Sequence, residues 1–231
     1  MEKHTTKEEY IKAFFSDTGA TYDTVVSLFT FGIDRLWKRK IVERLTTPKR
    51  ILDLACGTGI LTTMIAKKYP DSEIVAVDVS PSYLEVAWRK SFRKKIKNTS
   101  FILSLAEDFR SNNRFDAITA SYLPKYAKLP TLIHHLSQMI HPGGVLIFHD
   151  FTYPKKKFLK LLFAGYFKII PVIGGWLFSE WKGVLRELPC LIQETTWVTD
   201  LKTALAREGF DRIEVESLTM EGSAIVSARK K

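Results

Sequence analysis

The sequence predicts an α/β fold built on a mostly parallel, doubly wound sheet. Short runs of apolar and β-branched residues alternate with longer segments of helical periodicity. This alternation is the pattern of strands joined by right-handed helical crossovers. The chain has 231 residues, of which 45% are hydrophobic and 26% charged. That length and composition predict one globular domain spanning 1–231 rather than two domains or a disordered chain.

Seven strands are predicted. The first five cover residues 50–55, 73–78, 99–103, 115–119 and 145–149. Crossover helices are predicted at about 60–69, 81–96 and 130–140. A last helix over 200–208, closed by Gly209, precedes the final two strands at 212–217 and 223–228.

Two segments lie outside this alternation. Thr6 to Glu9 has the form of a capping box and predicts a helix through Phe15, and a second helix is predicted over 25–45. The regular pattern also stops after Pro154 for roughly forty residues. We therefore expect a helical cap between strands five and six, over the carboxyl edge of the sheet. The predicted parts are an N-terminal helical lid (1–48), a core (49–153 and 198–231) and the cap (154–197).

The most apolar stretch of the chain runs from 158 to 178. Lys160, Lys168, Pro171 and the pair Gly174-Gly175 interrupt it, so a transmembrane helix is the less favoured interpretation. The formal net charge of +10 favours acidic partners such as anionic lipid or nucleic acid. Two cysteines and an N-terminus without a signal-peptide pattern predict a reduced, cytoplasmic protein.

A glycine-rich loop follows the first strand. Residues 51–62 read ILDLACGTGILT, a buried strand that runs through Gly57 and Gly59 into a helix start. Such a loop lets the backbone approach a nucleotide-like ligand at the carboxyl end of the strand. Asp78 ends the next strand, where a carboxylate can accept both hydroxyls of a ribose. The two features together predict a nucleoside-containing cofactor.

Two details argue against a nicotinamide dinucleotide. Thr62 stands where that fingerprint has a third small residue. Asp53 would repel a pyrophosphate but can bind an ammonium group directly or through water. S-adenosylmethionine carries an ammonium group and no phosphate, so it fits the loop better.

These residues resemble the class I S-adenosylmethionine-dependent methyltransferases, which have DxxxGxG after the first strand and an acidic residue after the second. Further landmarks in the same order are AEDF at 106–109, FDAITAS at 115–121 and HPGGVLIFHD at 141–150. The resemblance implies a Rossmann-like fold and S-adenosyl-L-methionine as cofactor, released as S-adenosyl-L-homocysteine. The cofactor-binding residues expected from the loop and from this resemblance are Tyr22, Asp53, Ala55, Gly57, Thr58, Gly59, Asp78, Val79, Ala106, Glu107 and Ser121.

Within that superfamily the chain is most similar to the ubiquinone/menaquinone C-methyltransferases of the UbiE type. Tyr22-Asp23, the segment TFGIDRLWKR at 30–39 and FTYP at 151–154 carry this similarity. It implies methylation of a ring carbon on a prenylated quinol. The family's Gly-Leu-Arg-Asn segment, whose Arg-Asn pair is implicated in acid-base chemistry, is replaced here by Leu123-Pro124-Lys125-Tyr126.

Three residues are candidates for the catalytic groups. A desolvated Lys125 can act as a base, or as an ammonium it can stabilise a phenolate beside Tyr126. The alternative is a structural role for both residues, with the lysine solvated on a loop and the tyrosine packed against its neighbours. His149, followed by Asp150 at the end of the fifth strand, offers imidazole chemistry near neutral pH, against a role as a hydrogen-bonded structural histidine. No metal site is predicted, because no cluster has metal-ligand spacing.

The acceptor and the partners remain open at this level. Lysines interleaved with apolar residues over 155–169 fit an interfacial helix on an anionic membrane as well as a basic surface helix. Nucleic acid is a weaker partner because no RNA-binding module is evident. Alternatives to quinol methylation are N- or O-methylation of another small or lipid-like molecule, and cofactor binding without catalysis.

Overall fold

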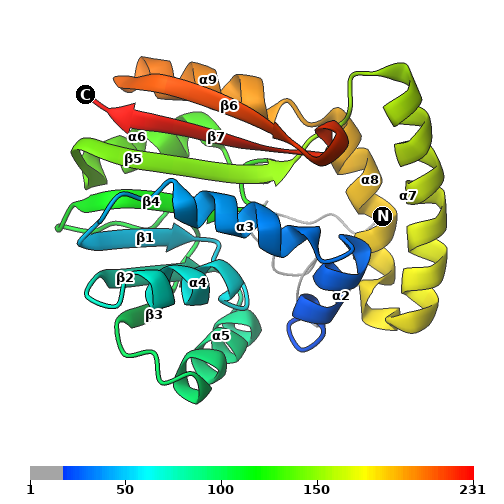
Figure 1. Ribbon diagram of the computed structural model, residues 1–231, viewed down its shortest axis with the longest axis horizontal. Helices are drawn as coiled ribbons and strands as arrows, with labels where there is room; N and C mark the ends of the chain where they lie inside the picture. The colour runs from blue at the N-terminus through cyan, green and yellow to red at the C-terminus, as the bar shows by residue number, and fades with distance from the viewer. Residues whose placement is uncertain (1–17) are drawn as a thin grey trace.

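The chain folds into an α/β structure around one twisted seven-stranded sheet (Figure 1), seen in a computed structural model that describes residues 18–231. The strand order is β3-β2-β1-β4-β5-β7-β6. All neighbouring strands run parallel except β7, which is antiparallel to both β5 and β6. This is the predicted doubly wound sheet, and the reversal of strand order between β1 and β4 opens a crevice at their carboxyl ends.

The strands follow the predicted order with small changes at their ends. Their bounds are Arg50–Leu54 (β1), Glu73–Asp78 (β2), Thr99–Leu103 (β3), Phe115–Ser121 (β4), Ile140–Phe151 (β5), Phe210–Leu218 (β6) and Ser223–Lys230 (β7). The largest change is in β5, which starts at Ile140 rather than 145. A register irregularity between Phe115 and Ala117 of β4 accommodates the His141–Gly144 turn within this longer strand.

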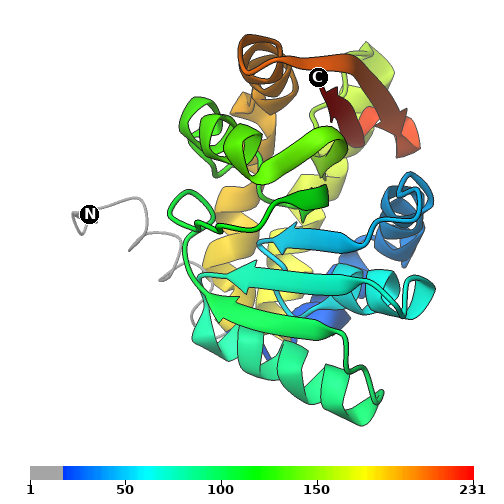
Figure 2. The same cartoon turned by 90° about the vertical axis from the view of Figure 1, so that its left-hand side faces the viewer.

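Helices cover both faces of the sheet, as Figure 2 shows. The helices α3 (Ile33–Glu43) and α4 (Ile60–Lys68) cover one face, and α6 (Leu129–Met139) and α9 (Trp197–Arg207) cover the other. The helix α5 (Pro81–Arg93) packs against β2 and β3. Ile51 and Leu52 illustrate the result: both are fully buried on β1, one in each of the two cores.

The N-terminal helices differ from the prediction. The helix predicted over 6–15 lies outside the described residues, and the helix predicted over 25–45 is two helices, α2 (Tyr22–Phe29) and α3. The chain turns between them because Phe31 and Gly32 adopt positive φ angles of 51° and 73°. A left-handed pair of residues cannot continue an α-helix, so the axis changes direction at the TFG sequence.

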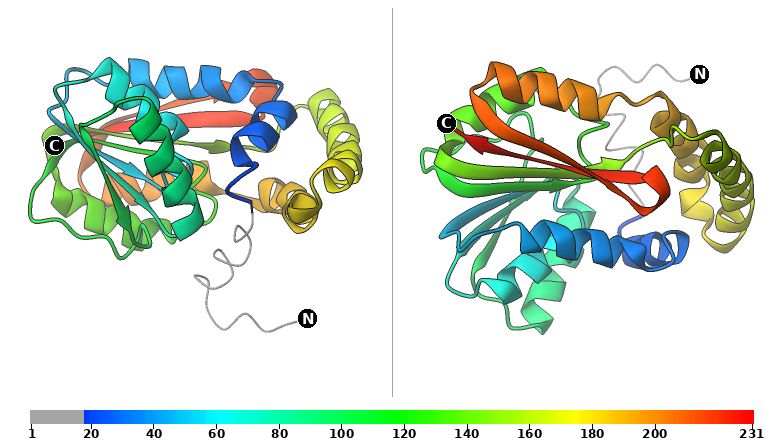
Figure 3. Two further views of the ribbon diagram at one scale, coloured as in Figure 1. Left: turned by 90° about the horizontal axis from the view of Figure 1, so that it is seen from below. Right: turned by 45° about the horizontal axis from the view of Figure 1, so that its top comes forward.

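The segment between β5 and α9 is helical and lies over the carboxyl ends of the strands. It consists of α7 (Lys157–Leu177), a short 3₁₀ turn (Ser179–Trp181) and α8 (Lys182–Glu194). Both views of Figure 3 show α7 at the edge of the molecule, and the right-hand view shows α8 between α7 and the sheet. The residues that interrupt the apolar sequence do not interrupt the helix, since α7 continues through Pro171 as one helix of 21 residues. By length and composition α7 is able to cross a membrane, and only 11% of its most apolar window is buried.

Trp197 provides a test of how the core is held. It is 2% exposed, and its indole N–H donates to the carbonyl of Phe151 at 2.7 Å. We expect Trp197→Ala to lower the free energy of unfolding by about 3–5 kcal/mol, because it leaves a large cavity and an unpaired carbonyl. Trp176→Ala, at a tryptophan that is 83% exposed, is the matched control and should change stability by less than about 0.5 kcal/mol. Urea denaturation measures both, and equal losses would contradict this account of the core.

Candidate active site

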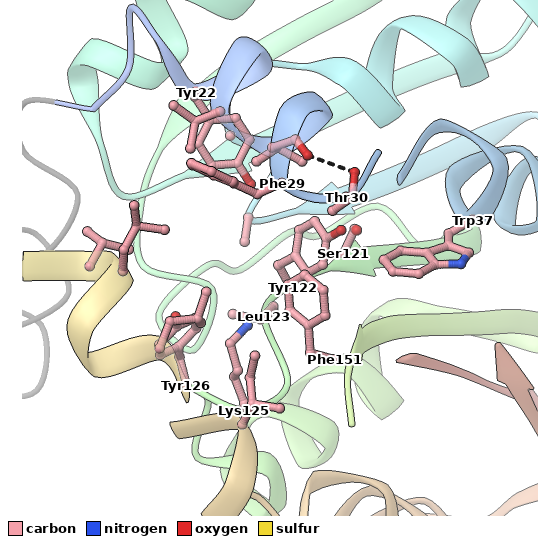
Figure 4. A pocket seen from close by; sticks show the side chains of 18 of the residues that line it. Tyr22, Phe29, Thr30, Trp37, Ser121, Tyr122, Leu123, Lys125, Tyr126 and Phe151 are labelled. Carbon is pink, nitrogen blue, oxygen red and sulfur yellow. Dashed lines mark hydrogen bonds between the residues drawn. The ribbon is translucent and has the colours of Figure 1, made fainter. Parts of the chain in front are cut away.

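An apolar cavity of about 350 Å³ lies at the carboxyl ends of the strands, between the sheet and the helical segments. Its floor comes from the loops after β1 to β5, one side from α2 and the start of α3, and the opposite side from α7 and α8. Figure 4 shows Tyr22 and Phe29 on one side of the cavity and Lys125 and Tyr126 on the other. The site therefore lies at the switch point of the doubly wound sheet.

The glycine loop is held in a conformation that only small residues tolerate. Gly57 and Gly59 have positive φ angles of 56° and 75°. A Cβ added at Gly59 would lie 3.0 Å from the Cβ of Ala87 on α5, so glycine is also needed for the close approach of the loop to that helix. Gly57 lines the cavity and Gly59 does not. The first glycine thus borders the ligand space and the second seats the loop.

Asp78 connects the glycine loop to the second strand. Its carboxylate accepts hydrogen bonds from the backbone N–H of Gly57 at 2.7 Å and of Ser80 at 2.9 Å. Burial raises the pKa of this carboxyl, and the backbone hydrogen bonds oppose that shift. Asp78 also lines the cavity. An anionic acceptor of hydrogen bonds is therefore presented to a ligand beside the glycine loop.

Asp53 and Thr58 lie behind the loop rather than on the cavity wall. The Asp53 carboxylate is 1% exposed and accepts hydrogen bonds from Thr62 at 2.6 Å and Thr119 at 2.8 Å. The Thr58 hydroxyl donates to Asp23, which pairs with Lys90 at 2.6 Å. Neither Asp53 nor Thr58 lines the cavity. In this structure both residues support the loop from behind, and the ammonium contact expected of Asp53, directly or through water, stays a prediction.

Aromatic side chains form the wall of the cavity near the glycine loop. Tyr22 is the first residue of α2, and its ring centroid lies 5.1 Å from that of Tyr83 and 5.8 Å from that of Trp181. On the β3 side the wall continues through Leu105, Ala106 and Glu107. The Glu107 carboxylate accepts the backbone N–H of Lys128 at 3.0 Å. Flat apolar walls next to a carboxylate suit a nucleoside.

A buried ion pair lies at the other end of the cavity. Lys125 Nζ is 2.6 Å from Asp150 Oδ1, and the two side chains are 2% and 0% exposed. Asp150 also accepts the backbone N–H groups of Lys125 and Phe151. Burial lowers the pKa of Lys125 and raises that of Asp150, while their mutual attraction opposes both shifts. The Lys125 ammonium also lies over the ring of Tyr126, 4.3 Å from its centroid.

A second buried network meets the same end of the cavity. The Tyr122 hydroxyl donates to Asp34 at 2.7 Å, and the same carboxylate oxygen binds Lys38 one helical turn further along α3. Burial and the Asp34 charge raise the pKa of Tyr122 well above its ordinary value, so the phenol stays protonated as a donor. The Tyr122 ring stacks on Phe151 with a centroid distance of 4.8 Å and lines the cavity.

His149 is enclosed between the strands and does not reach the cavity. It is fully buried, with Nδ1 2.9 Å from the Ser121 hydroxyl and Nε2 2.8 Å from that of Ser223. The Ser223 hydroxyl donates to the carbonyl of Asp150, so it accepts a hydrogen bond from Nε2–H of the ring. Burial, followed by the charges of Lys38 and Lys125, lowers the pKa of His149 well below its ordinary value. These contacts make His149 a structural support for Ser121 and argue against its predicted role in catalysis.

The structure brings most of the predicted site residues to one cavity. Those on its wall are Tyr22, Ala55, Gly57, Asp78, Val79, Ala106, Glu107, Ser121, Lys125 and Tyr126. Those behind the wall are Asp53, Thr58, Gly59 and His149. Asp34 and Lys38 were not predicted as site residues, although both belong to the TFGIDRLWKR segment and their spacing of four places them on one helix face. Within residues 18–231, no group of three or more potential metal ligands comes together.

The seven-stranded sheet, the glycine loop with Asp78 and the cavity above them define a class I S-adenosylmethionine-dependent methyltransferase. The sequence matches the ubiE/COQ5 methyltransferase family over residues 3–230, and the chain belongs to that family. Its cofactor is accordingly S-adenosylmethionine.

Individual relatives agree with this assignment. The chain is 32% identical over 217 residues to the demethylmenaquinone methyltransferase of Thermus thermophilus, covering 91% of this chain and 97% of that protein. It is 29% identical over 222 residues to the ubiquinone/menaquinone biosynthesis C-methyltransferase UbiE of Geobacter sulfurreducens, covering 91% and 84%. Magnesium protoporphyrin IX methyltransferase from Synechocystis PCC 6803, solved with S-adenosylmethionine bound, shares the fold with a TM-score of 0.67 at 14% identity, covering 100% of both chains.

The buried carboxyl of Asp53 predicts a measurable pH dependence of stability. Burial raises its pKa to about 6 against hydrogen bonds from two threonines, so the folded protein holds this proton more tightly than the unfolded chain. Its contribution to stability is present below about pH 4 and is lost as the pH rises through about 6. We expect Asp53→Asn to remove this loss, so that the variant gains about 3 kcal/mol relative to the natural protein between about pH 4 and pH 7.

Urea denaturation at a series of pH values measures this difference in the free energy of unfolding. Asp71→Asn removes an exposed carboxylate and controls for the loss of one negative charge. If the two variants have the same pH profile, the burial of Asp53 does not produce the effect.

Proposed function

We propose that this protein transfers the methyl group of S-adenosylmethionine to a ring carbon of a prenylated quinol or a similar apolar aromatic molecule. The buried Lys125–Asp150 pair at the end of an otherwise apolar, aromatic-walled cavity carries this proposal. A flat ring fits between aromatic walls, and its hydroxyl needs one charged partner. The relatives are demethylmenaquinone and ubiquinone/menaquinone methyltransferases, which supports a quinone-type acceptor.

The cofactor would occupy the end of the cavity next to the glycine loop. The Asp78 carboxylate would accept the ribose hydroxyls, since it lines the cavity while it accepts two backbone N–H groups. Val79, Leu105 and Ala106 would pack on the adenine, and Tyr22 would cover the methionine end from α2. This carboxylate acceptor and the apolar walls fit a nucleoside with a ribose diol and no phosphate.

The acceptor would occupy the end next to Lys125. Bound S-adenosylmethionine supplies an electrophilic methyl group, so the chain needs to align a nucleophilic carbon with it and remove a proton. Tyr122 and Phe151, stacked on each other, and Trp37 would hold the quinol ring. The cavity wall is apolar here, which excludes water from the developing phenolate.

Lys125 would handle the hydroxyl proton. Because burial lowers its pKa, the neutral amine is more accessible than in an exposed lysine. The amine would accept the proton of the acceptor hydroxyl, and the resulting ammonium, paired with Asp150 at 2.6 Å, would face the phenolate oxygen. The ring carbon next to that oxygen would then attack the methyl group as its bond to sulfur breaks and S-adenosylhomocysteine leaves. The proton on that carbon would be released to solvent, and the Lys125 ammonium would return its proton to the ring oxygen. Tyr126 would position Lys125 through the face of its ring.

We propose that the chain forms one methyltransferase domain. Its parts are a lid (1–48), a core (49–153 and 198–231) and a cap (154–197). The basic cap would bring the protein to an anionic membrane surface on the cytoplasmic side, where a prenylated acceptor is dissolved in lipid.

Cofactor binding tests the first half of this proposal. We expect Asp78→Ala to weaken S-adenosylmethionine binding at least about tenfold, because the ribose loses its acceptor and the Gly57 N–H loses its partner. Isothermal titration calorimetry measures the change, with the exposed Asp71→Ala as the matched control. Unchanged affinity in Asp78→Ala would remove Asp78 from the cofactor site.

Methyl transfer tests the second half. The purified protein is incubated with methyl-labelled S-adenosylmethionine and a reduced total lipid extract, and labelled products are identified by mass spectrometry. We expect a quinol labelled on a ring carbon. We also expect the double variant Lys125→Arg with Tyr126→Asn, which introduces the family's Arg-Asn pair, to change the rate of methylation of a quinol. Its rate on other acceptors should change by a different factor. Label on a nitrogen or oxygen, or on a water-soluble acceptor alone, would favour the N- or O-methyltransferase alternative.

A further inference from the structure

The outer face of α7 is an apolar surface that the fold leaves uncovered. Eight large apolar side chains of α7 are exposed, and only Leu177, the last residue of the helix, lies apart from the others. At 100° per residue the other seven fall within an arc of roughly 120°. They are Phe158, Leu161, Leu162, Ile169, Val172, Ile173 and Trp176, each between 46% and 83% exposed. We call these seven residues the outer face. They extend along nearly the whole helix, a length of about 30 Å at 1.5 Å per residue. Such a patch marks an interaction site.

The opposite side of α7 is built into the fold. Leu159 and Gly174 are buried, and a Cβ at Gly174 would lie 2.3 Å from Leu185 of α8. Phe163, Tyr166, Phe167 and Ile170 line the cavity. If α7 crossed a membrane it would have to leave this wall and uncover the cavity. The contacts instead favour a helix that stays on the protein and presents its outer face to a partner.

The cavity reaches the surface beside this face. Phe31, between α2 and α3, and Leu162, on α7, both line the cavity and are 78% and 56% exposed. Between these two elements the Tyr166 hydroxyl donates to the carbonyl of Phe29, and the rings of Phe31 and Tyr166 lie 6.3 Å apart. Phe31 and Leu162 therefore mark an apolar mouth of the cavity, next to the outer face.

Charge decides which partner fits the outer face. The helix α7 contains Lys157, Lys160 and Lys168, all exposed, and no Asp or Glu. Lys155 and Lys156 precede it. In a symmetric dimer through this face, lysines would meet lysines, because each subunit contributes the same surface. An anionic bilayer instead offers acyl chains to the apolar arc and phosphates to the lysines.

We propose that α7 lies flat on an anionic bilayer with its outer face inserted, so that the mouth between Phe31 and Leu162 opens directly to the acyl chains. The acceptor then enters from lipid without crossing water, an inference that rests on the proposed lipid-soluble acceptor. The docking surface itself requires no methyl transfer. It consists of residues that the proposed chemistry does not use, apart from Leu162 at the mouth.

Binding to vesicles tests the docking surface. We expect the protein to float with vesicles of phosphatidylcholine mixed with phosphatidylglycerol and much less with phosphatidylcholine alone. The double variant Leu161→Asp with Val172→Asp should lower the ratio of bound to free protein at least about tenfold, because two inserted apolar side chains become anionic. Both residues lie outside the cavity wall, and S-adenosylmethionine binding measured by calorimetry should be unchanged, which shows that the variant is folded.

A second exposed aromatic patch provides the matched control. Trp88 and Phe92 of α5 are 56% and 73% exposed, stack at 5.7 Å and lie among basic residues. Trp88→Asp with Phe92→Asp should leave vesicle binding within about twofold of the natural protein, if insertion is specific to α7. Equal losses in the two double variants, normal binding by the α7 variant, or no vesicle binding by the natural protein would each overturn the proposal. So would loss of a dimer in the α7 variant by sedimentation, since a second copy would then cover the face.

Methylation assays separate this proposal from the proposed function. In vesicles that contain a prenylated quinol, the α7 double variant should be at least about tenfold slower than the natural protein, in line with its loss of binding. Its rate on a quinol without the prenyl tail, dissolved in buffer, should be unchanged. If the natural protein binds vesicles but methylates neither quinol, the proposed acceptor is contradicted while the docking surface is still supported. Equal slowing on both quinols would contradict entry from the bilayer.

Discussion

The ion pair between Lys125 and Asp150 is the interaction on which the site depends. Two charges can be held under an apolar cavity only when each satisfies the other, because removing one partner leaves an uncompensated buried charge that costs about 3–5 kcal/mol. Asp150, near the end of β5, pairs with the Lys125 ammonium and also accepts hydrogen bonds from two backbone N–H groups. It thereby holds the loop after β4 against β5. The same carboxylate fixes the backbone of the cavity floor and sets the protonation chemistry of Lys125.

Charged groups surround the cavity without filling it. Asp78 and Asp53 lie beneath the glycine loop, and the Asp34–Lys38 pair lies beneath Tyr122. Each is satisfied by backbone N–H groups, hydroxyls or an opposite charge, so that most of the wall itself is apolar and aromatic. This arrangement concentrates polar interactions at two ends of an otherwise dry space. It suits a reaction that joins a polar cofactor to an apolar ring.

The helix α7 has two roles because it is apolar on two sides. Its inner side closes the cavity against α2 and α8, and its outer face is left to a partner. An ordinary surface helix keeps one polar face toward solvent, and α7 differs from it because two of its sides are apolar. The mouth beside Phe31 connects the two sides. The cap thus joins the site that handles the ring to a surface suited to the medium in which a prenylated ring dissolves.

The amino-acid sequence alone determined the order of the strands and helices, the glycine loop and the carboxylate of Asp78, because these depend on local periodicity and short spacings. It also carried the resemblance that the family match confirmed. Other features depend on contacts between distant segments. The strand-end position of His149 allows a catalytic or a structural imidazole, and only the folded chain places both its nitrogens against serines from neighbouring strands. Asp34 accepts a hydrogen bond from Tyr122, which lies 88 residues further along the chain. Only the tertiary structure decides such pairings, since burial and hydrogen-bond partners are properties of the packed chain.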